Sequence, residues 1–140
     1  MYSIGLCMKL VLYSHAVQAG FPSPADDYKE SALSLDEHLI KHPAATYVAR
    51  AAGDSMEGIG IFDKDLLIID RSLEPKNGDI VIAAVDGELT CKQIDTIRRQ
   101  LIAHNPNYPP IMLSDDQDLV LEGVVIASIR YHRACHVSHC

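Results

Sequence analysis

A serine and a lysine are the two side chains of this chain that could together carry out a reaction. Ser55 stands in the sequence Gly53-Asp54-Ser55-Met56, directly after an apolar stretch, in a turn that a glycine allows to bend tightly. Serine becomes a nucleophile only when a base removes its proton, and the usual base is histidine. The seven histidines, at positions 15, 38, 42, 104, 132, 136 and 139, all fall outside the predicted core strands. The base must therefore be sought elsewhere.

Lys92 is the other candidate base. It follows Ser55 by 37 positions and lies in a predicted strand, 89–94, in which Lys92 shares a face with Thr90 and Ile94. A lysine that points toward apolar surroundings has a lowered pKa, because its ammonium form is disfavoured there, and this is what a Ser-Lys dyad requires. The residue types alone also fit a serine in a structural turn and a strand lysine that faces water.

The elements that would position this pair are mostly short strands. Apolar runs at 66–69, 80–85, 89–94, 101–103 and 119–129 are separated by turn residues. Asp86-Gly87 predicts a two-residue hairpin between strands 80–85 and 88–94. Ser34 and Glu37 have the spacing of a capping box and predict a short helix that ends by Pro43. The fold class is therefore mainly β, in a single domain of short twisted strands.

The first thirty residues differ from the rest and are interpreted as a flexible N-terminal arm, residues 1–30. Pro22 and Pro24 closely follow Gly20, so this stretch is expected to be extended and accessible rather than helical. Residues 31–131 are expected to form the β-rich domain. Residues 132–140 are expected to be a disordered tail.

Five blocks of residues resemble a known family in order and spacing: 20–28 (GFPSPADDY), 53–56 (GDSM), 65–68 (DLLI), 78–88 (GDIVIAAVDGE) and 90–92 (TCK). Together they resemble the UmuD family, the SOS-mutagenesis relatives of the self-cleaving domain of the LexA repressor. The resemblance implies a LexA/UmuD-like serine peptidase that acts on itself. It assigns Ser55 as the nucleophile, Lys92 as the general base, and Ala19-Gly20 as the bond that is cut.

The resemblance also implies partners. RecA filaments on single-stranded DNA would stimulate the cleavage, and the trimmed chain would join a UmuC-like Y-family polymerase in translesion DNA synthesis. A homodimer is implied too, and the apolar strands 80–85 and 119–129 favour it because they exceed what one small domain buries. A cytoplasmic location and no cofactor are expected.

Composition limits the other possibilities. The formal net charge is −7, from 12 basic and 19 acidic side chains, so no direct sequence-specific DNA binding is expected. No apolar run reaches the roughly 18 residues of a membrane span, and no membrane association is expected. Four cysteines are too few for a typical disulfide-rich secreted domain, which favours an intracellular protein.

Several alternatives remain open at this point. The chain could be a non-catalytic polymerase accessory module, or a LexA-like or phage repressor fragment without its DNA-binding domain. Residues 1–19 could be a signal peptide, with Val17 and Ala19 before the cleaved bond, although Lys9 interrupts its apolar run. A signal peptidase, which also uses a serine and a lysine, would need a membrane anchor. The histidines and cysteines at 132, 135, 136 and 140 could bind zinc.

Overall fold

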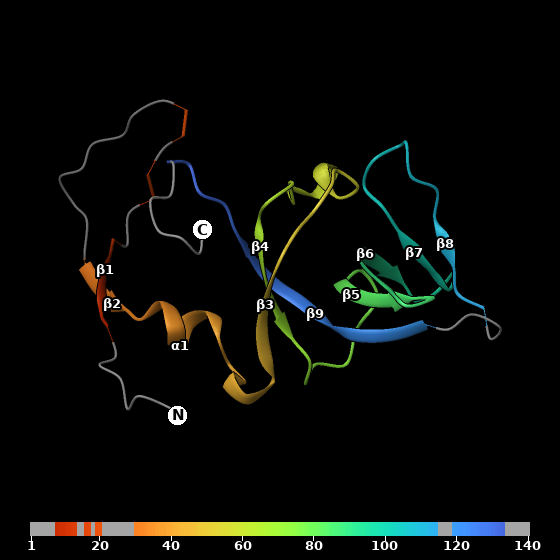
Figure 1. Cartoon of the computed structure of the whole chain (residues 1–140). Helices are drawn as coiled ribbons and strands as arrows, with labels where there is room; N and C mark the ends of the chain where they lie inside the picture. Colours follow the sequence, from red (N-terminus) through yellow and green to blue (C-terminus); the bar gives the residue numbers. More distant parts are fainter. Residues whose placement is uncertain (1–7, 14–15, 18, 21–29, 115–118, 134–140) are drawn as a thin grey trace. The chain divides into compact units, whose positions relative to one another are not determined.

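The computed structural model of the chain describes residues 8–13, 16–17, 19–20, 30–114 and 119–133 (Figure 1). The chain divides into two compact units, Met1–Lys41 and His42–Cys140. The division falls between Lys41 and His42, so the first unit contains both the arm expected over residues 1–30 and the segment that follows it. The short helix therefore belongs to the same unit as the arm.

The first unit contains a two-stranded sheet and a helix. Strand β1 (Leu10–Tyr13) pairs antiparallel with β2 (Glu30–Leu33), and α1 (Leu35–Leu39) follows. The side chain of Ser34 accepts a hydrogen bond from the backbone N–H of Glu37, which confirms the predicted N-cap. All four side chains of β1 are exposed. Sequence analysis missed the β1–β2 pairing, because it joins segments separated by many residues and leaves no local pattern.

The second unit is built on one seven-stranded antiparallel sheet with the order β3-β4-β9-β5-β6-β7-β8. The strands are β3 (Thr46–Arg50), β4 (Leu66–Asp70), β5 (Ile80–Val85), β6 (Glu88–Asp95), β7 (Gln100–Ile102), β8 (Ile111–Met112) and β9 (Leu119–Ile129). Two single 3-10 turns, η1 (Pro43–Ala45) and η2 (Glu57–Ile59), complete the unit. Figure 1 shows β9 running through the middle of the sheet. The predicted mainly-β class is confirmed.

The strands predicted from apolar runs all form. The local turn residues explain the β5–β6 hairpin in particular. Val85 of β5 pairs with Glu88 of β6 across Asp86 and Gly87, whose φ angles are 51° and 84°. Two positive φ values are what a tight hairpin of this kind needs. Strand β8 was not predicted, since a two-residue strand has no recognisable period.

The two faces of the sheet carry separate apolar clusters. One face packs Met56, Ile61, Leu67, Ile69 and Ile82, and the other packs Val81, Ala83, Ile94, Leu101 and Val124. Cys91 of β6 packs against the first cluster, whereas Ile94 belongs to the second. The alternation expected for strand β6 is therefore observed, and it places Lys92 on the same face as buried Ile94. No helix in the described part of the chain is long and apolar enough to span a membrane.

Candidate active site

Ser55 lies in a turn that leads from β3 into η2. Gly53 adopts a φ of 91°, a left-handed conformation that glycine accepts at little cost, and its N–H donates to the carboxylate of Asp63 over 2.8 Å. Met56, the next residue after Ser55, is only 3% exposed and packs into the first apolar cluster. The Gly53–Asp63 hydrogen bond before Ser55 and the buried Met56 after it therefore hold the turn, which places the serine at the surface of the core.

Lys92 reaches this serine from strand β6. Its Nζ lies 3.1 Å from Ser55 Oγ, 2.8 Å from Thr90 Oγ1 and 3.1 Å from the carbonyl oxygen of Cys91. The side chain is 7% exposed, so almost the whole of its length is removed from water. All three acceptors are uncharged, and none of them offsets the cost of burying an ammonium group.

Burial lowers the pKa of Lys92 below its ordinary value, because desolvation disfavours the charged form; the neighbouring Cys91 opposes this slightly. Burial likewise raises the pKa of the Cys91 thiol to about 11, so Cys91 is not the nucleophile near neutral pH. In its neutral form the lysine amine can donate two protons, to Thr90 Oγ1 and the Cys91 carbonyl. Its lone pair is then free to accept the proton of the Ser55 hydroxyl.

A pocket of about 220 Å³ opens beside Ser55. It is lined by Ala49, Arg50, Ala51, Ala52, Gly53, Ser55, Met56, Ile61, Leu67, Ile82, Leu89, Thr90 and Cys91. Small and apolar side chains dominate this lining, and Arg50 is its one charged member. A pocket of this size and character suits a small aliphatic side chain next to the bond that the serine attacks.

The structure brings Ser55 and Lys92 together, as the dyad requires. Ala19 and Gly20 belong to the other compact unit, where both are exposed to solvent. The proline-rich block that follows Gly20, and the tail from residue 134, lie outside the described residues. Among the residues that are described, no group of three or more His, Cys, Asp or Glu side chains could hold a metal ion.

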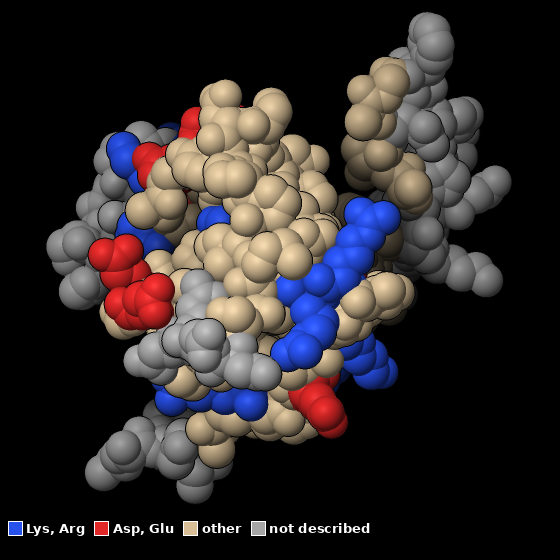
Figure 2. Space-filling view, turned by 90° about the vertical axis from the view of Figure 1, so that its right-hand side faces the viewer, with Lys and Arg blue, Asp and Glu red and all other residues tan. Residues whose placement is uncertain are grey.

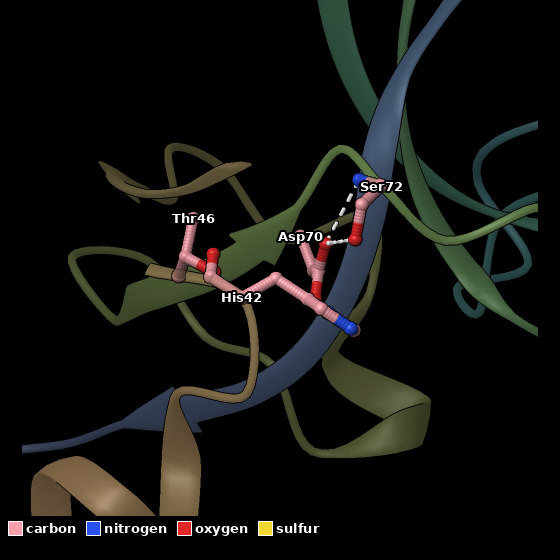
Figure 3. Close-up of polar contacts among 4 residues, drawn as sticks. All are labelled: His42, Thr46, Asp70 and Ser72. Carbon is pink, nitrogen blue, oxygen red and sulfur yellow. Dashed lines mark hydrogen bonds and ion pairs between the residues drawn. The ribbon is translucent and has the colours of Figure 1, made fainter. Parts of the chain in front are cut away.

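A second set of serine, histidine and aspartate side chains lies elsewhere in the unit, around the end of β4 (Figure 3). His42 Nδ1 is 2.6 Å from Asp70 Oδ2, while Ser72 donates to Asp70 Oδ1 through both its N–H and its hydroxyl, over 2.8 and 2.6 Å. The carboxylate stands between the other two, so the Ser72 hydroxyl donates to Asp70 and not to the imidazole of His42. This arrangement secures the chain at the start of the unit and lacks the order of a catalytic triad.

Among the described histidines, His104 touches Ser55 without acting as its base. His104 contacts Ser55 through its backbone N–H, which donates to the Ser55 carbonyl over 2.7 Å, while its ring Nε2 lies 2.6 Å from Gln93 Oε1. Sequence reasoning did not assign a role to Thr90 or to the Cys91 carbonyl. Thr90 could have been found, because a residue two positions before Lys92 in a strand shares its face.

The surface charge is unevenly spread. The face shown in Figure 2 carries a row of Lys and Arg side chains with only a few acidic ones near it, although the whole chain has a net charge of −7. The overall charge therefore does not describe this face.

Comparisons with known proteins agree with the geometry. The Peptidase S24-like family model matches residues 11–126. The chain is 43% identical over 124 residues to Protein SamA of Salmonella typhimurium, covering 88% of this chain and 86% of SamA. It is 41% identical over 122 residues to Protein ImpA of Escherichia coli, covering 86% of this chain and 80% of ImpA. It is also 39% identical over 117 residues to the LexA repressor of Pseudomonas chlororaphis, covering 81% of this chain and 57% of the repressor.

The family model matches most of the chain, and the structure holds a serine and a buried lysine in hydrogen-bond contact. Together these findings identify the family of the chain. The chain belongs to the Peptidase S24-like family, as a UmuD-type SOS-mutagenesis protein with a self-cleaving serine peptidase domain.

Proposed function

We propose that Ser55 and Lys92 cut the bond between Ala19 and Gly20 of this same protein. The observation that carries the proposal is the 3.1 Å contact between Lys92 Nζ and Ser55 Oγ, made by a lysine that is 7% exposed. Nucleophile and base are then already in contact, at a distance suited to proton transfer. The mainly apolar pocket of about 220 Å³ beside Ser55 supports a small apolar residue such as Ala19 on the acyl side of the cut bond.

The mechanism follows from the two groups. The neutral amine of Lys92 takes the proton of the Ser55 hydroxyl as Oγ attacks the carbonyl carbon of Ala19. The resulting ammonium gives that proton to the nitrogen of Gly20, the C–N bond breaks, and Ala19 stays esterified to Ser55. Water, activated by the same amine, then hydrolyses the ester and frees the serine. We assign the stabilisation of the oxyanion to backbone N–H groups of the Ser55 turn.

The wider role follows from the family. We propose that RecA filaments on single-stranded DNA stimulate the cleavage, and that the chain starting at Gly20 forms a homodimer and serves a UmuC-like Y-family polymerase in the cytoplasm. Identity of about 40% to SamA and ImpA over most of the chain supports this assignment. Strand β9 supports a homodimer, because Val120, Leu121 and Ile129 are 50%, 37% and 38% exposed. We propose no direct sequence-specific DNA contact and no cofactor.

The test is the product itself. The purified full chain is incubated with RecA, nucleotide and single-stranded DNA, and its intact mass is measured before and after. The proposal predicts one new species, whose N-terminal sequence reads Gly-Phe-Pro-Ser-Pro. A different N-terminus would contradict the assigned bond, and no product under these conditions would leave the chain a non-catalytic accessory module.

A further inference from the structure

A turn at residues 105–108 packs against the segment that carries Ser55. Its sequence is Asn105-Pro106-Asn107-Tyr108, and the N–H of Tyr108 donates to the carbonyl of Asn105 over 3.0 Å. The side-chain Oδ1 of Asn105 accepts from the N–H of Asn107 over 2.9 Å. Asparagine first and proline second are favoured in such turns, so the conformation is set locally by its sequence.

This turn and His104 before it form hydrogen bonds to Asp54 and to Ser55 itself. Asn105 Nδ2 donates to the carbonyl of Asp54 over 3.1 Å, and the Tyr108 hydroxyl donates to Asp54 Oδ1 over 2.6 Å. The N–H of His104 donates to the carbonyl of Ser55 over 2.7 Å. Because Asn105 Oδ1 is occupied by Asn107, its amide is oriented with Nδ2 toward Asp54. Both peptide carbonyls flanking the Ser55 nitrogen and Cα are therefore fixed.

The same loop is tied to the strand that carries the base. His104 Nε2 is 2.6 Å from Gln93 Oε1, and Gln93 Nε2 donates to the carbonyl of Gly78 over 2.9 Å. With its amide nitrogen used in that way, Gln93 presents an acceptor and His104 donates to it. Gln93 directly follows Lys92 in β6. The loop thus connects the turn of the nucleophile to the strand of the base.

The approach of the loop to the Ser55 turn is close. The N–H of Gly58 donates to the carbonyl of His104 over 2.8 Å, and a Cβ at position 58 would come within 2.6 Å of that oxygen. Only glycine accepts this contact without movement of one side. The loop therefore touches the segment on both sides of Ser55, at Asp54 and at Gly58.

We propose that Asn105 and Tyr108 are positioning residues for self-cleavage, which hold Ser55 at its distance from Lys92 by hydrogen bonds to Asp54. The inference rests on the proposed Ser55–Lys92 mechanism and adds two residues that touch neither the substrate nor the reacting atoms. A displacement of the nucleophile by about 1 Å costs on the order of 100-fold in rate, so loss of either bond has a kinetic effect.

The hydrogen bond from Tyr108 to Asp54 also persists at the mildly alkaline pH at which self-cleavage is expected to be fastest. The hydrogen bond to the Asp54 carboxylate, and the negative charge of that carboxylate, raise the pKa of Tyr108 above its ordinary value. The phenol consequently keeps its proton, and its role as donor, across the mildly alkaline range in which Lys92 becomes neutral.

The experiment compares full-length variants in self-cleavage without an activator, from pH 7 to pH 10. Tyr108→Phe removes only the hydroxyl, and Asn105→Ala removes the amide donor. The matched control is Tyr131→Phe, at a tyrosine that is 50% exposed and follows β9 by two residues. Asp54→Ala and Asp54→Asn form a second pair, since asparagine keeps an oxygen that accepts from Tyr108. Each variant is also tested for labelling of Ser55 by a small fluorophosphonate, which does not depend on the arm.

We expect Tyr108→Phe and Asn105→Ala to lower the maximal cleavage rate by roughly 10- to 100-fold, with the midpoint of the pH profile unchanged, because Lys92 keeps its surroundings. Ser55 labelling should fall in parallel and the thermal midpoint should change little. Asp54→Asn should keep most of the cleavage rate that Asp54→Ala loses. Adding Tyr108→Phe to Asp54→Ala should cost no further rate, because the two remove the same bond.

The positioning role is overturned if Tyr108→Phe and Asn105→Ala both cut and label like Tyr131→Phe, or if their loss of rate follows a loss of folding alone. Should one of them fail to fold, the other and the Asp54 pair decide the question. Ser55→Ala in the same series distinguishes a failure of the positioning role from a failure of the proposed Ser55–Lys92 mechanism. If Ser55→Ala cuts like the unmodified chain, the proposed mechanism fails and the positioning role fails with it.

Discussion

The two compact units of this chain are built in opposite ways. In the unit His42–Cys140, Ile69, Val81 and Leu101 are fully buried, and a serine in the turn after β3 touches a lysine of β6. In the unit Met1–Lys41 the sheet has two strands, and apolar side chains of β1 such as Val11 are 61% exposed. An isolated pair of strands is marginally stable in water. The unit whose described residues form this core holds the two side chains that we propose react, and the other unit holds the bond that we propose is cut.

This difference is what self-cleavage requires. A nucleophile and its base must keep their geometry, which needs packing, whereas a peptide bond can be attacked only when its backbone is accessible and extended. On the proposed mechanism, the dyad is assembled before the substrate arrives. The step open to control is then the delivery of Ala19-Gly20 to Ser55.

The largest expected effect is on the rate of cleavage, and it contrasts substitutions of the dyad in the second unit with one substitution in the first. Lys92→Ala and Ser55→Ala should lower RecA-stimulated cleavage by at least about 10³-fold, because each removes one of the two reacting groups. Lys92→Arg should fail equally, since a guanidinium stays protonated. Lys9→Ala is the control in the first unit, at a lysine whose side chain is 56% exposed, and it should cut normally. The readout is the fraction of cut chain on a gel over time.

The second prediction concerns stability. Ile69→Ala, at a fully buried residue of β4, should lower the free energy of unfolding by about 2–5 kcal/mol, because it leaves a cavity in the core. Val11→Ala in β1 should change it by less than about 0.5 kcal/mol, since that side chain is already in water. Urea unfolding of both variants in a Ser55→Ala background measures the difference. Equal costs would contradict the contrast between the units.

A smaller effect is expected in acid, at the place where the second unit begins. Hydrogen bonds from Ser72, and then from His42, lower the pKa of the Asp70 carboxyl below its ordinary value. The unfolded chain therefore takes up the proton first as the pH falls, and the stabilisation present above about pH 4 is lost below it. Urea midpoints at pH 5 and pH 3 should fall less in Asp70→Asn than in the chain that keeps Asp70. The same fall in both would show that Asp70 does not contribute.

Local patterns in the sequence predict much of the fold. Asp86-Gly87 specified its hairpin, and the apolar alternation of 89–94 placed Lys92 on its correct face. Ser55 and Lys92 became a strong hypothesis through the family resemblance, because residue types alone also fitted an ordinary turn and an ordinary surface lysine. Contacts between distant segments were missed. Neither the β1–β2 pairing nor the contact of Tyr108 with Asp54 leaves a periodic pattern, since each depends on how separate segments pack.

The most direct test of the dyad is a pH series of self-cleavage on the purified full chain, without RecA. Burial lowers the pKa of Lys92 below its ordinary value, so the neutral base accumulates as the pH rises toward 10. The rate should climb from about pH 7 and level off once Lys92 is neutral, and Lys92→Ala should show no alkaline reaction. A flat profile, or a Lys92→Ala chain that still cuts at pH 10, would contradict the account.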